Sequence, residues 1–438
     1  MKDQLSRREF TRVAIGAAVI GLNPDARSWV TEASKTARPF DRVPNLDGAL
    51  LLDEESRRAI ATDEGYMFHR VPAAVLRPGS VQDVVAMVRY ANQHNLKVAI
   101  RGHGHSRYGQ TQAEAGLVID SRSLNAVRLR TPQSADTQPG ALWSTVLEAM
   151  LAKGLTPRLV PGTCLDLLTV GGTLNAGGIG NMSPRYGALV DNVTDLDVVT
   201  GDGRLVTCSP EHESELFDMV LAGQGQCGVI VRAGLPLLPA PTHVTYHELT
   251  YTDLDAYLSD QLRLAREGRF DGQRGTMLRG QSGKWSFRIE IGKFFTPPNE
   301  PDIRALESDL HFSSAVAPVR MTYRDYLFLL AARGVGGPGA AGTGRPSPSS
   351  QCGSRPRRPG HIWTTFCRSL QRQRIFPVSM GSKGSVAIPC ILVASPVRFS
   401  RCPARSRRSL YGSFAALSRV TMLRFRLCWP ATGTSSPR

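Results

Sequence analysis

Three glycine-rich segments, each beside an apolar run, constrain the fold of this chain more than any other feature. They span residues 102–110, 171–180 and 223–231. Glycine accepts positive φ and lets a ligand come against bare backbone, and successive loop N–H groups form a concavity that binds anions. No Gly-x-x-x-x-Gly-Lys phosphate loop is present, which disfavours nucleotide hydrolysis. We therefore predict a fold built around a large planar cofactor with a diphosphate tail.

The first segment carries reactive side chains as well as glycines. It follows a short apolar run and contains His103, His105 and Ser106. A cofactor loop, a His-x-His metal pair and a structural turn are the three interpretations, since imidazole is a common metal ligand. No third or fourth ligand with suitable spacing accompanies the histidines, and we predict no metal site.

Helices and strands alternate around this segment. An apolar stripe after Ser80, with Asp83 at the third helical position, predicts a capped helix at 80–92. Apolar runs at 98–100 and 117–119 predict strands. The first glycine segment then lies at the carboxyl end of a strand, where ligand loops are usual in α/β arrangements. It does not match the Gly-x-Gly-x-x-Gly fingerprint.

The next part of the chain predicts smaller elements. We expect a helix at 144–153 that Gly154 closes. A hairpin of residues 196–200 and 205–207 is expected around an Asp-Gly turn, and a short helix at 213–221. Five glycines between 171 and 180 predict a segment that is neither a normal helix nor a strand.

The positive charge of the chain is confined to its C-terminal part. The net charge is +16, but no acidic residue follows Asp325, whereas 17 Arg and one Lys do. Residues 1–325 hold 35 basic and 37 acidic side chains. The main part of the protein is therefore near neutral, and we expect no specific nucleic-acid partner. Its three cysteines, Cys164, Cys208 and Cys227, do not make a disulfide framework.

The first 39 residues are predicted to be a signal and linker. Paired Arg7 and Arg8, then Phe10, precede an apolar run at 13–22 that is too short to span a bilayer. This pattern resembles a twin-arginine export signal, which predicts a periplasmic or extracellular protein without a membrane span. An ordinary amphipathic helix is the alternative.

Several motifs together resemble one flavoprotein superfamily. They are Arg-Gly-His-Gly-His-Ser at 101–106, Leu-Thr-Val-Gly-Gly-Thr-Leu at 168–174, and the matching stretches at 185–187, 191–193, 196–201, 206–209 and 223–231. On these residues the chain resembles enzymes with the vanillyl-alcohol-oxidase-type (PCMH-type) FAD-binding domain, and most of all cytokinin dehydrogenases. The resemblance covers roughly residues 45–330 and implies FAD as cofactor.

The resemblance also implies roles for particular residues. His105 would be bonded covalently to the 8α-methyl group of FAD. The diphosphate and ribityl chain would be lined by Gly102, His103, Gly104, Ser106 and Gln110. The remaining FAD contacts would come from Thr169, Asn175, Ile179 and Ile230, for which ordinary strand-edge packing is the alternative.

The catalytic position departs from the pattern of cytokinin dehydrogenases. Those enzymes carry an Asp five residues before the Thr of Thr-Val-Gly-Gly, where it accepts a proton from the substrate amine. Here that position holds Cys164, and the nearest carboxylate is Asp166. We predict Asp166 as the catalytic base, with a turn or capping residue as the alternative.

The resemblance implies an α+β fold with two main parts. Residues 40–240 would form a two-subdomain PCMH-type FAD-binding domain. Residues 241–332 would form part of an α+β substrate (cap) domain, with strand-like or helical pieces at 276–278, 285–291 and 303–310.

Residues 333–438 form a basic tail of aberrant composition. They lack acidic residues, are rich in Arg, Ser, Pro and Gly, and show little periodicity. A disordered basic arm that binds nucleic acid is one interpretation. We favour a shifted reading frame, because residues 346–353 read one base later are compatible with a Pro-His-Pro segment of the family.

These observations predict an FAD-dependent oxidoreductase that transfers a hydride from a small-molecule amine or alcohol to flavin N5. Cytokinin-like N6-substituted adenines are the first substrate expected. A sugar or alcohol oxidase of the same superfamily is the second hypothesis. An inactive product whose basic tail dominates its behaviour is the third.

Overall fold

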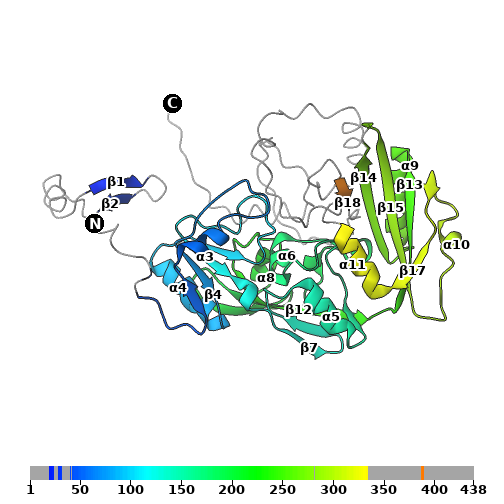
Figure 1. Cartoon of the computed structure of the whole chain (residues 1–438). Coiled ribbons are helices and arrows are strands. Elements are labelled where there is room, and N and C mark those ends of the chain that lie inside the picture. The colour runs from blue at the N-terminus through cyan, green and yellow to red at the C-terminus, as the bar shows by residue number, and fades with distance from the viewer. Residues whose placement is uncertain are drawn as a thin grey trace, which may run out of the picture.

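The computed structural model describes Phe40 and residues 42–280 and 282–333. It also describes the backbone of three strands, β1 (Val19–Asn23), β2 (Ser28–Thr31) and β18 (Val386–Ile388). The paired arginines of the predicted export signal, and the tail apart from Arg333 and β18, lie outside these residues. Figure 1 shows three larger sheets along the chain, with helices between them.

The first sheet has four strands in the order β3-β4-β6-β5. Strands β4 and β5 both pair in parallel with β6, and β3 pairs antiparallel with β4. The segments that follow β5 and β6 therefore leave the sheet at the same edge. The elements are β3 (Ala49–Leu51), α3 (Glu54–Ala59), β4 (Ala74–Arg77), α4 (Val81–Gln93), β5 (Val98–Arg101), β6 (Leu117–Asp120) and the 3-10 helix η1 (Ser121–Ser123).

Helix α4 confirms the predicted helix at 80–92 and joins two sheets. Ser80 Oγ accepts the N–H of Asp83 at 3.4 Å. The Asp83 carboxylate accepts three backbone N–H groups from the turns before the helix, rather than the N–H of the cap residue itself. Arg89 Nε, farther along the helix, donates to the carbonyl of Gly203 at 3.0 Å. That carbonyl belongs to the hairpin turn of the second sheet.

The second sheet has the order β11-β10-β12-β8-β7, and β9 pairs with the end of β12. Strands β10 and β11 form the predicted hairpin, and α5 and α8 are the predicted helices. The elements are β7 (Val127–Thr131), β8 (Ser134–Thr137), α5 (Trp143–Leu151), β9 (Leu155–Pro157), α6 (Val170–Ala176), α7 (Ser183–Tyr186), η2 (Leu189–Asp191), β10 (Leu196–Val199), β11 (Leu205–Cys208), α8 (Ser214–Val220) and β12 (Val229–Pro239).

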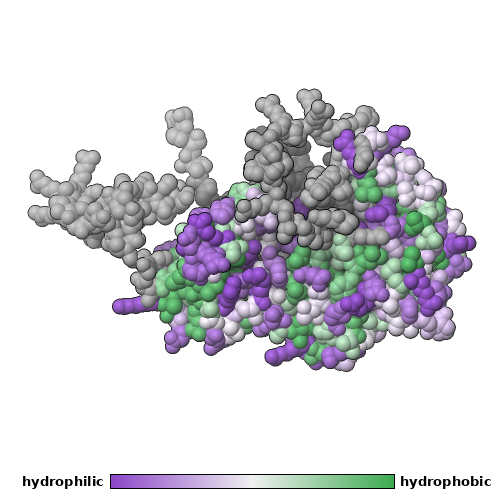
Figure 2. Space-filling view, in the orientation of Figure 1, coloured by the Kyte–Doolittle hydropathy of each residue, from purple (hydrophilic) through white to green (hydrophobic). Residues whose placement is uncertain are grey.

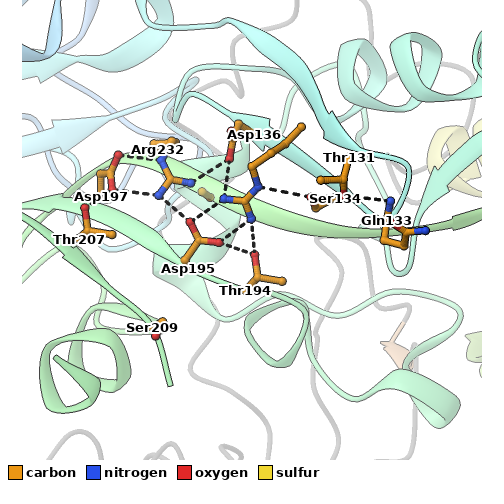
Figure 3. Close-up of polar contacts among 12 residues, drawn as sticks. Thr131, Gln133, Ser134, Asp136, Thr194, Asp195, Asp197, Thr207, Ser209 and Arg232 are labelled. Atoms are coloured by element: carbon orange, nitrogen blue, oxygen red, sulfur yellow. Dashed lines mark hydrogen bonds and ion pairs between the residues drawn. The ribbon is translucent and has the colours of Figure 1, made fainter. Parts of the chain in front are cut away.

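A network of ion pairs crosses this second sheet, as Figure 3 shows. Arg232 on β12 lies 2.7 Å from Asp197, 2.6 Å from Asp195 and 2.9 Å from Asp136. Arg130 on β7 lies 2.9 Å from Asp195. Four of these five side chains are partly buried, whereas Arg130 is exposed. They come from β7, β8, β10 and β12 or the residues beside them. Opposite charges on neighbouring strands stabilise this register of the sheet.

One expectation about the second glycine segment was wrong, because its first half is a regular helix. Helix α6 contains Gly171 and Gly172 in its first turn and ends at Gly177, where φ is +105°. Packing explains Gly171, because a Cβ there would lie 2.6 Å from the Cβ of Pro139. Close approach to a neighbouring segment therefore outweighs the low helix propensity of glycine here.

The third sheet has the order β16-β13-β15-β14-β18, with β17 also paired to β13. Strands β14 and β15 and helix α10 confirm the pieces predicted at 276–278, 285–291 and 303–310. Helix α9 covers one face through the buried cluster that includes Tyr257 and Phe287. The elements are β13 (His243–Tyr251), α9 (Leu254–Glu267), β14 (Gly272–Arg279), β15 (Trp285–Phe295), α10 (Ile303–Glu307), β16 (Ser314–Ala315), β17 (Val319–Thr322) and α11 (Tyr323–Arg333).

Helix α11 joins the third sheet to the second sheet (Figure 1). Its Tyr326 and Leu330 share one buried cluster with Val198 and Ile230 of the second sheet. Strand β12 ends at Pro239 and strand β13 begins at His243, so the predicted boundary between residues 240 and 241 falls between them. The predicted division into residues 40–240 and 241–332 remains a proposal.

The described surface mixes polar and apolar residues. Figure 2 shows hydrophilic and hydrophobic residues interspersed over the visible face. Within the part of the chain that the structure describes, no helix has the length and hydrophobicity needed to cross a bilayer.

Candidate cofactor site

One pocket lies where the three glycine-rich segments meet. The first segment follows β5, the second forms α6, and the third precedes β12. Nine of the ten predicted cofactor residues line this pocket: Gly102, His103, Gly104, His105, Ser106, Gln110, Thr169, Asn175 and Ile230. The structure thus brings together residues that lie more than 120 positions apart in the sequence.

A buried arginine lies beneath the first segment. Gly104 has φ of +74°, and a Cβ there would lie 2.3 Å from the guanidinium of Arg101. That guanidinium donates to the carbonyl of Thr62 at 2.8 Å, and Ser121 Oγ donates to the Arg101 carbonyl at 3.0 Å. The loop therefore folds closely over a buried positive charge, an arrangement suited to an anionic ligand.

The first segment also packs directly on the start of α6. A Cβ at Gly102 would lie 2.3 Å from Thr169 Oγ1. The same oxygen caps α6 by accepting the N–H of Gly172 at 3.3 Å. Only a residue without a side chain fits between the β5 loop and this helix.

The third segment closes the pocket from another side. The N–H of Gln224 donates to the carbonyl of Asn175 at 2.9 Å. A Cβ at Gly225 would lie 3.1 Å from the side chain of Ile100. Gln224, Gly225 and Ile100 all line the pocket, so the third segment completes a wall shared by two sheets.

An unpartnered oxygen lies in this pocket. Asn175 is buried, and its Nδ2 donates to the carbonyl of Gly171 at 2.8 Å. Among the residues that the structure describes, its Oδ1 has no hydrogen-bond partner. Buried polar atoms are rarely left unpaired in a native protein. This acceptor and the glycine-lined cradle together fit a bound cofactor with hydrogen-bond donors.

The two histidines of the first segment differ in their surroundings. His105 Nδ1 lies 2.6 Å from Glu64 Oε2, and this hydrogen bond lowers the pKa of Glu64. Partial burial and the nearby Arg122 guanidinium lower the pKa of His103. His103 is therefore neutral at pH 7, whereas His105 is held by a carboxylate at the rim of the pocket. Within the described residues, no group of three or more His, Cys, Asp or Glu side chains is arranged to hold a metal ion.

Two predicted site residues lie outside the pocket. Ile179 is not among its lining residues and instead accepts the N–H of Gly162 through its carbonyl. Asp166 is exposed and lines a separate surface groove with Glu148 and Arg324.

The turn around Cys164 explains where Asp166 points. Cys164 has φ of +53°, and its carbonyl accepts the N–H groups of Leu167 and Leu168. This tight turn directs Leu167 and Leu168 to the cofactor pocket and leaves Asp166 at the surface. Burial raises the pKa of the Cys164 thiol. The structure does not bring Asp166 to the site where it was predicted to act.

Sequence reasoning missed other residues of the site. Ser121 lines the pocket because it follows β6, whose carboxyl end meets that of β5; parallel pairing of the predicted strands would have indicated it. Asp63 and Glu64 contact the first segment from the turn before β4. No periodicity or motif in the sequence marks them.

Part of the chain matches a known protein family. Residues 72–209 match the family model described as an FAD binding domain. This range contains the first two glycine-rich segments. The protein therefore carries an FAD-binding domain, and its α+β fold is that of the vanillyl-alcohol-oxidase (PCMH-type) flavoenzymes. The predictions of this fold class and of FAD as cofactor are confirmed.

Two relatives define the similarity more closely. The chain is 39% identical over 271 residues to an uncharacterised oxidoreductase of the fasciation locus of Rhodococcoides fascians, covering 61% of each chain. It is 40% identical over 320 residues to cytokinin dehydrogenase 9 of Oryza sativa subsp. japonica, covering 64% of this chain and 61% of the relative. The chain thus spans about three fifths of the length of these relatives.

Solved structures show the same fold. The chain aligns with 6-hydroxy-D-nicotine oxidase from Arthrobacter nicotinovorans at a TM-score of 0.56 and 22% identity, covering 66% of this chain and 64% of the other. A chitooligosaccharide oxidase aligns with a TM-score of 0.55 at 22% identity, covering 66% and 62%. At this identity the likeness concerns the fold.

Proposed function

We propose that the protein is an FAD-dependent oxidoreductase that oxidises an amine or an alcohol. The observation that carries the proposal is the pocket that unites the three glycine-rich segments, with an unpartnered Asn175 oxygen inside it and the His105 imidazole at its rim. Bound FAD supplies a two-electron acceptor at flavin N5. The protein binds and orients the flavin and excludes water from it.

The pocket residues divide this work. Backbone groups of the first segment would hold the diphosphate and ribityl chain, with Ser106 and Gln110 beside them. Asn175 Oδ1 would accept a hydrogen bond from the cofactor, and Ile230 would contribute apolar contact. His105 would supply the covalent attachment to the 8α-carbon. Gly102 keeps the loop against Thr169, so that the two halves of the pocket stay together.

We propose an N6-substituted adenine of the cytokinin type as the first substrate to test. Relatives named cytokinin dehydrogenases share 37–42% identity with this chain over half or more of its length. A sugar or alcohol is the second candidate. The analogy that predicts Asp166 as the base is not carried into this proposal, because Asp166 lies in a separate surface groove.

The protein is further proposed to be exported through the twin-arginine route. Arg7 and Arg8, followed by an apolar run, support this. Replacement of both arginines by lysine should retain the full-length product in the cytoplasm, measured by cell fractionation. Equal export of the double variant would contradict this localisation.

Purification of the full chain tests the proposed function. The protein should be yellow, and the colour should remain with acid-precipitated protein if His105 is the attachment site. Anaerobic mixing with N6-substituted adenines, amines, alcohols or oligosaccharides should bleach the flavin for the true substrate class. A folded, colourless protein would contradict the proposal, and the inactive-product hypothesis would then stand.

A further inference from the structure

A carboxylate lies beside the imidazole that the proposed function assigns to flavin attachment. Glu64 Oε2 is 2.6 Å from His105 Nδ1. Glu64 belongs to the turn between α3 and β4, far from the glycine-rich segments in sequence. Its N–H donates to the carbonyl of Gly104 at 2.9 Å, and the N–H of Gly65 donates to the carbonyl of Ser106 at 3.3 Å. These two backbone hydrogen bonds join the Glu64 turn to the two residues that flank His105.

The neighbouring carboxylate has a different role. Asp63 is buried, and its Oδ2 accepts Ser106 Oγ at 3.0 Å and the N–H of Gly109 at 2.7 Å. These bonds hold the loop itself. The Glu64 side chain is 43% exposed, and its hydrogen bond is to the imidazole of His105. Loss of the Glu64 side chain should therefore leave the loop intact, whereas loss of the Asp63 carboxylate should not.

The contact determines how the imidazole is protonated. The hydrogen bond with His105 lowers the pKa of Glu64, so Glu64 is ionised at neutral pH. An ionised carboxylate only accepts hydrogen bonds, so Nδ1 of His105 must carry the proton. The partner of one ring nitrogen fixes the tautomer and the orientation of the whole ring. The carboxylate also stabilises the positive charge that an imidazole gains when one of its nitrogens bonds to carbon.

We propose that Glu64 is a positioning residue for covalent flavin attachment, because it orients His105 and is in place to accept the imidazole proton. This inference rests on the proposed function. In the net change, a C–H bond of the 8α-methyl group and an imidazole N–H bond break, and one C–N bond forms. The two hydrogens and the two electrons reduce one molecule of dioxygen to hydrogen peroxide.

The test uses the full chain with three substitutions and two readouts. Glu64→Leu keeps the approximate size of the side chain and removes the acceptor. Glu64→Gln restores a neutral acceptor of the same length. Asp63→Asn serves as the matched control for loop integrity. Total flavin per chain is measured by absorbance, and covalent flavin by the fraction that stays with acid-precipitated protein and by intact mass.

Glu64→Leu should keep total flavin within twofold of wild type while its covalent fraction falls at least fivefold. Glu64→Gln should recover part of that loss, and Asp63→Asn should lower total and covalent flavin together. A wild-type covalent fraction in Glu64→Leu would overturn the proposal, as would a parallel loss of total flavin like that of Asp63→Asn.

The outcome for the wild-type protein separates the two proposals. If the wild-type protein binds flavin but releases all of it in acid, the role of Glu64 is refuted while the FAD-dependent function stands. If it binds no flavin at all, the proposed function itself fails.

Discussion

The contact between Gly102 and Thr169 offers a quantitative test of how the cofactor pocket is assembled. A Cβ at position 102 would lie 2.3 Å from Thr169 Oγ1 and 3.1 Å from its Cγ2. Gly102 does not have positive φ, so the cost of Gly102→Ala is steric. Such overpacking costs about 1–3 kcal/mol. Since the contact joins the β5 loop to α6, flavin retention should fall about 5- to 150-fold if the same free energy opposes binding.

A double-mutant cycle isolates this contact. Thr169→Ala removes both clashing atoms, and its own cost is the lost helix cap at Gly172, about 1 kcal/mol. In the Thr169→Ala background, Gly102→Ala should therefore cost much less than in the wild type. The expected coupling is about 1–2 kcal/mol, within the range found for residues in direct contact.

The assay is the free energy of unfolding in urea for the wild type, both single variants and the double variant, together with flavin content. Gly201→Ala is the matched control, because a Cβ at Gly201 meets no atom within 4 Å and its backbone has no positive φ. Additive costs of Gly102→Ala and Thr169→Ala would refute the packing argument. So would a loss in Gly201→Ala as large as that in Gly102→Ala.

Three further variants test other parts of the structure. Asn175→Ala removes the unpartnered pocket acceptor. Because one hydrogen bond contributes about 1 kcal/mol, flavin retention should weaken about fivefold, measured as flavin released on dilution. Asp166→Asn should change the rate of anaerobic flavin reduction less than twofold, because Asp166 lines the surface groove; a loss of 100-fold would restore it as the base. Burial raises the pKa of Asp195, but hydrogen bonds from Arg130 and Arg232 outweigh this and hold it well below its usual range. The unfolded chain therefore takes up protons first, and the stability is present above about pH 4 and lost as the pH falls further. Arg232→Met should lower stability at pH 7 by about 2 kcal/mol and flatten this acid loss, seen in urea unfolding at pH 7, 4 and 3.

Local patterns predicted most of the elements, and the motifs of the resemblance picked out residues that the fold brings to one pocket. The helix at 80–92, the hairpin at 196–207 and the strand before the first glycine segment all depend on contacts within a few residues. Nine predicted cofactor residues line the pocket, and they were assigned from whole motifs of the resemblance rather than from periodicity.

The features that the sequence did not predict depend on contacts between residues distant in sequence or on an unusual backbone conformation. Gly171 of α6 is explained by Pro139, some thirty residues earlier, a contact that no local pattern shows. The outward direction of Asp166 follows from the positive φ of Cys164, a conformation unusual for a residue with a side chain. Likewise Asp63 and Glu64, which precede β4, contact the segment after β5 because both strands belong to the first sheet.

The placement of the pocket has a consequence for the stability of the whole molecule. One wall of the pocket is the loop after β5 of the first sheet. The other walls are α6 and the segment before β12 of the second sheet. The protein joins the two sheets through a shared buried cluster that includes Val84, Val199 and Val229. The pocket walls themselves meet where Gly102 packs on Thr169 and Gly225 on Ile100. A ligand that binds only the assembled pocket stabilises the assembled state by mass action. FAD held in this pocket would therefore contact both sheets as well as accept electrons, and the proposed bond through His105 would make that link permanent.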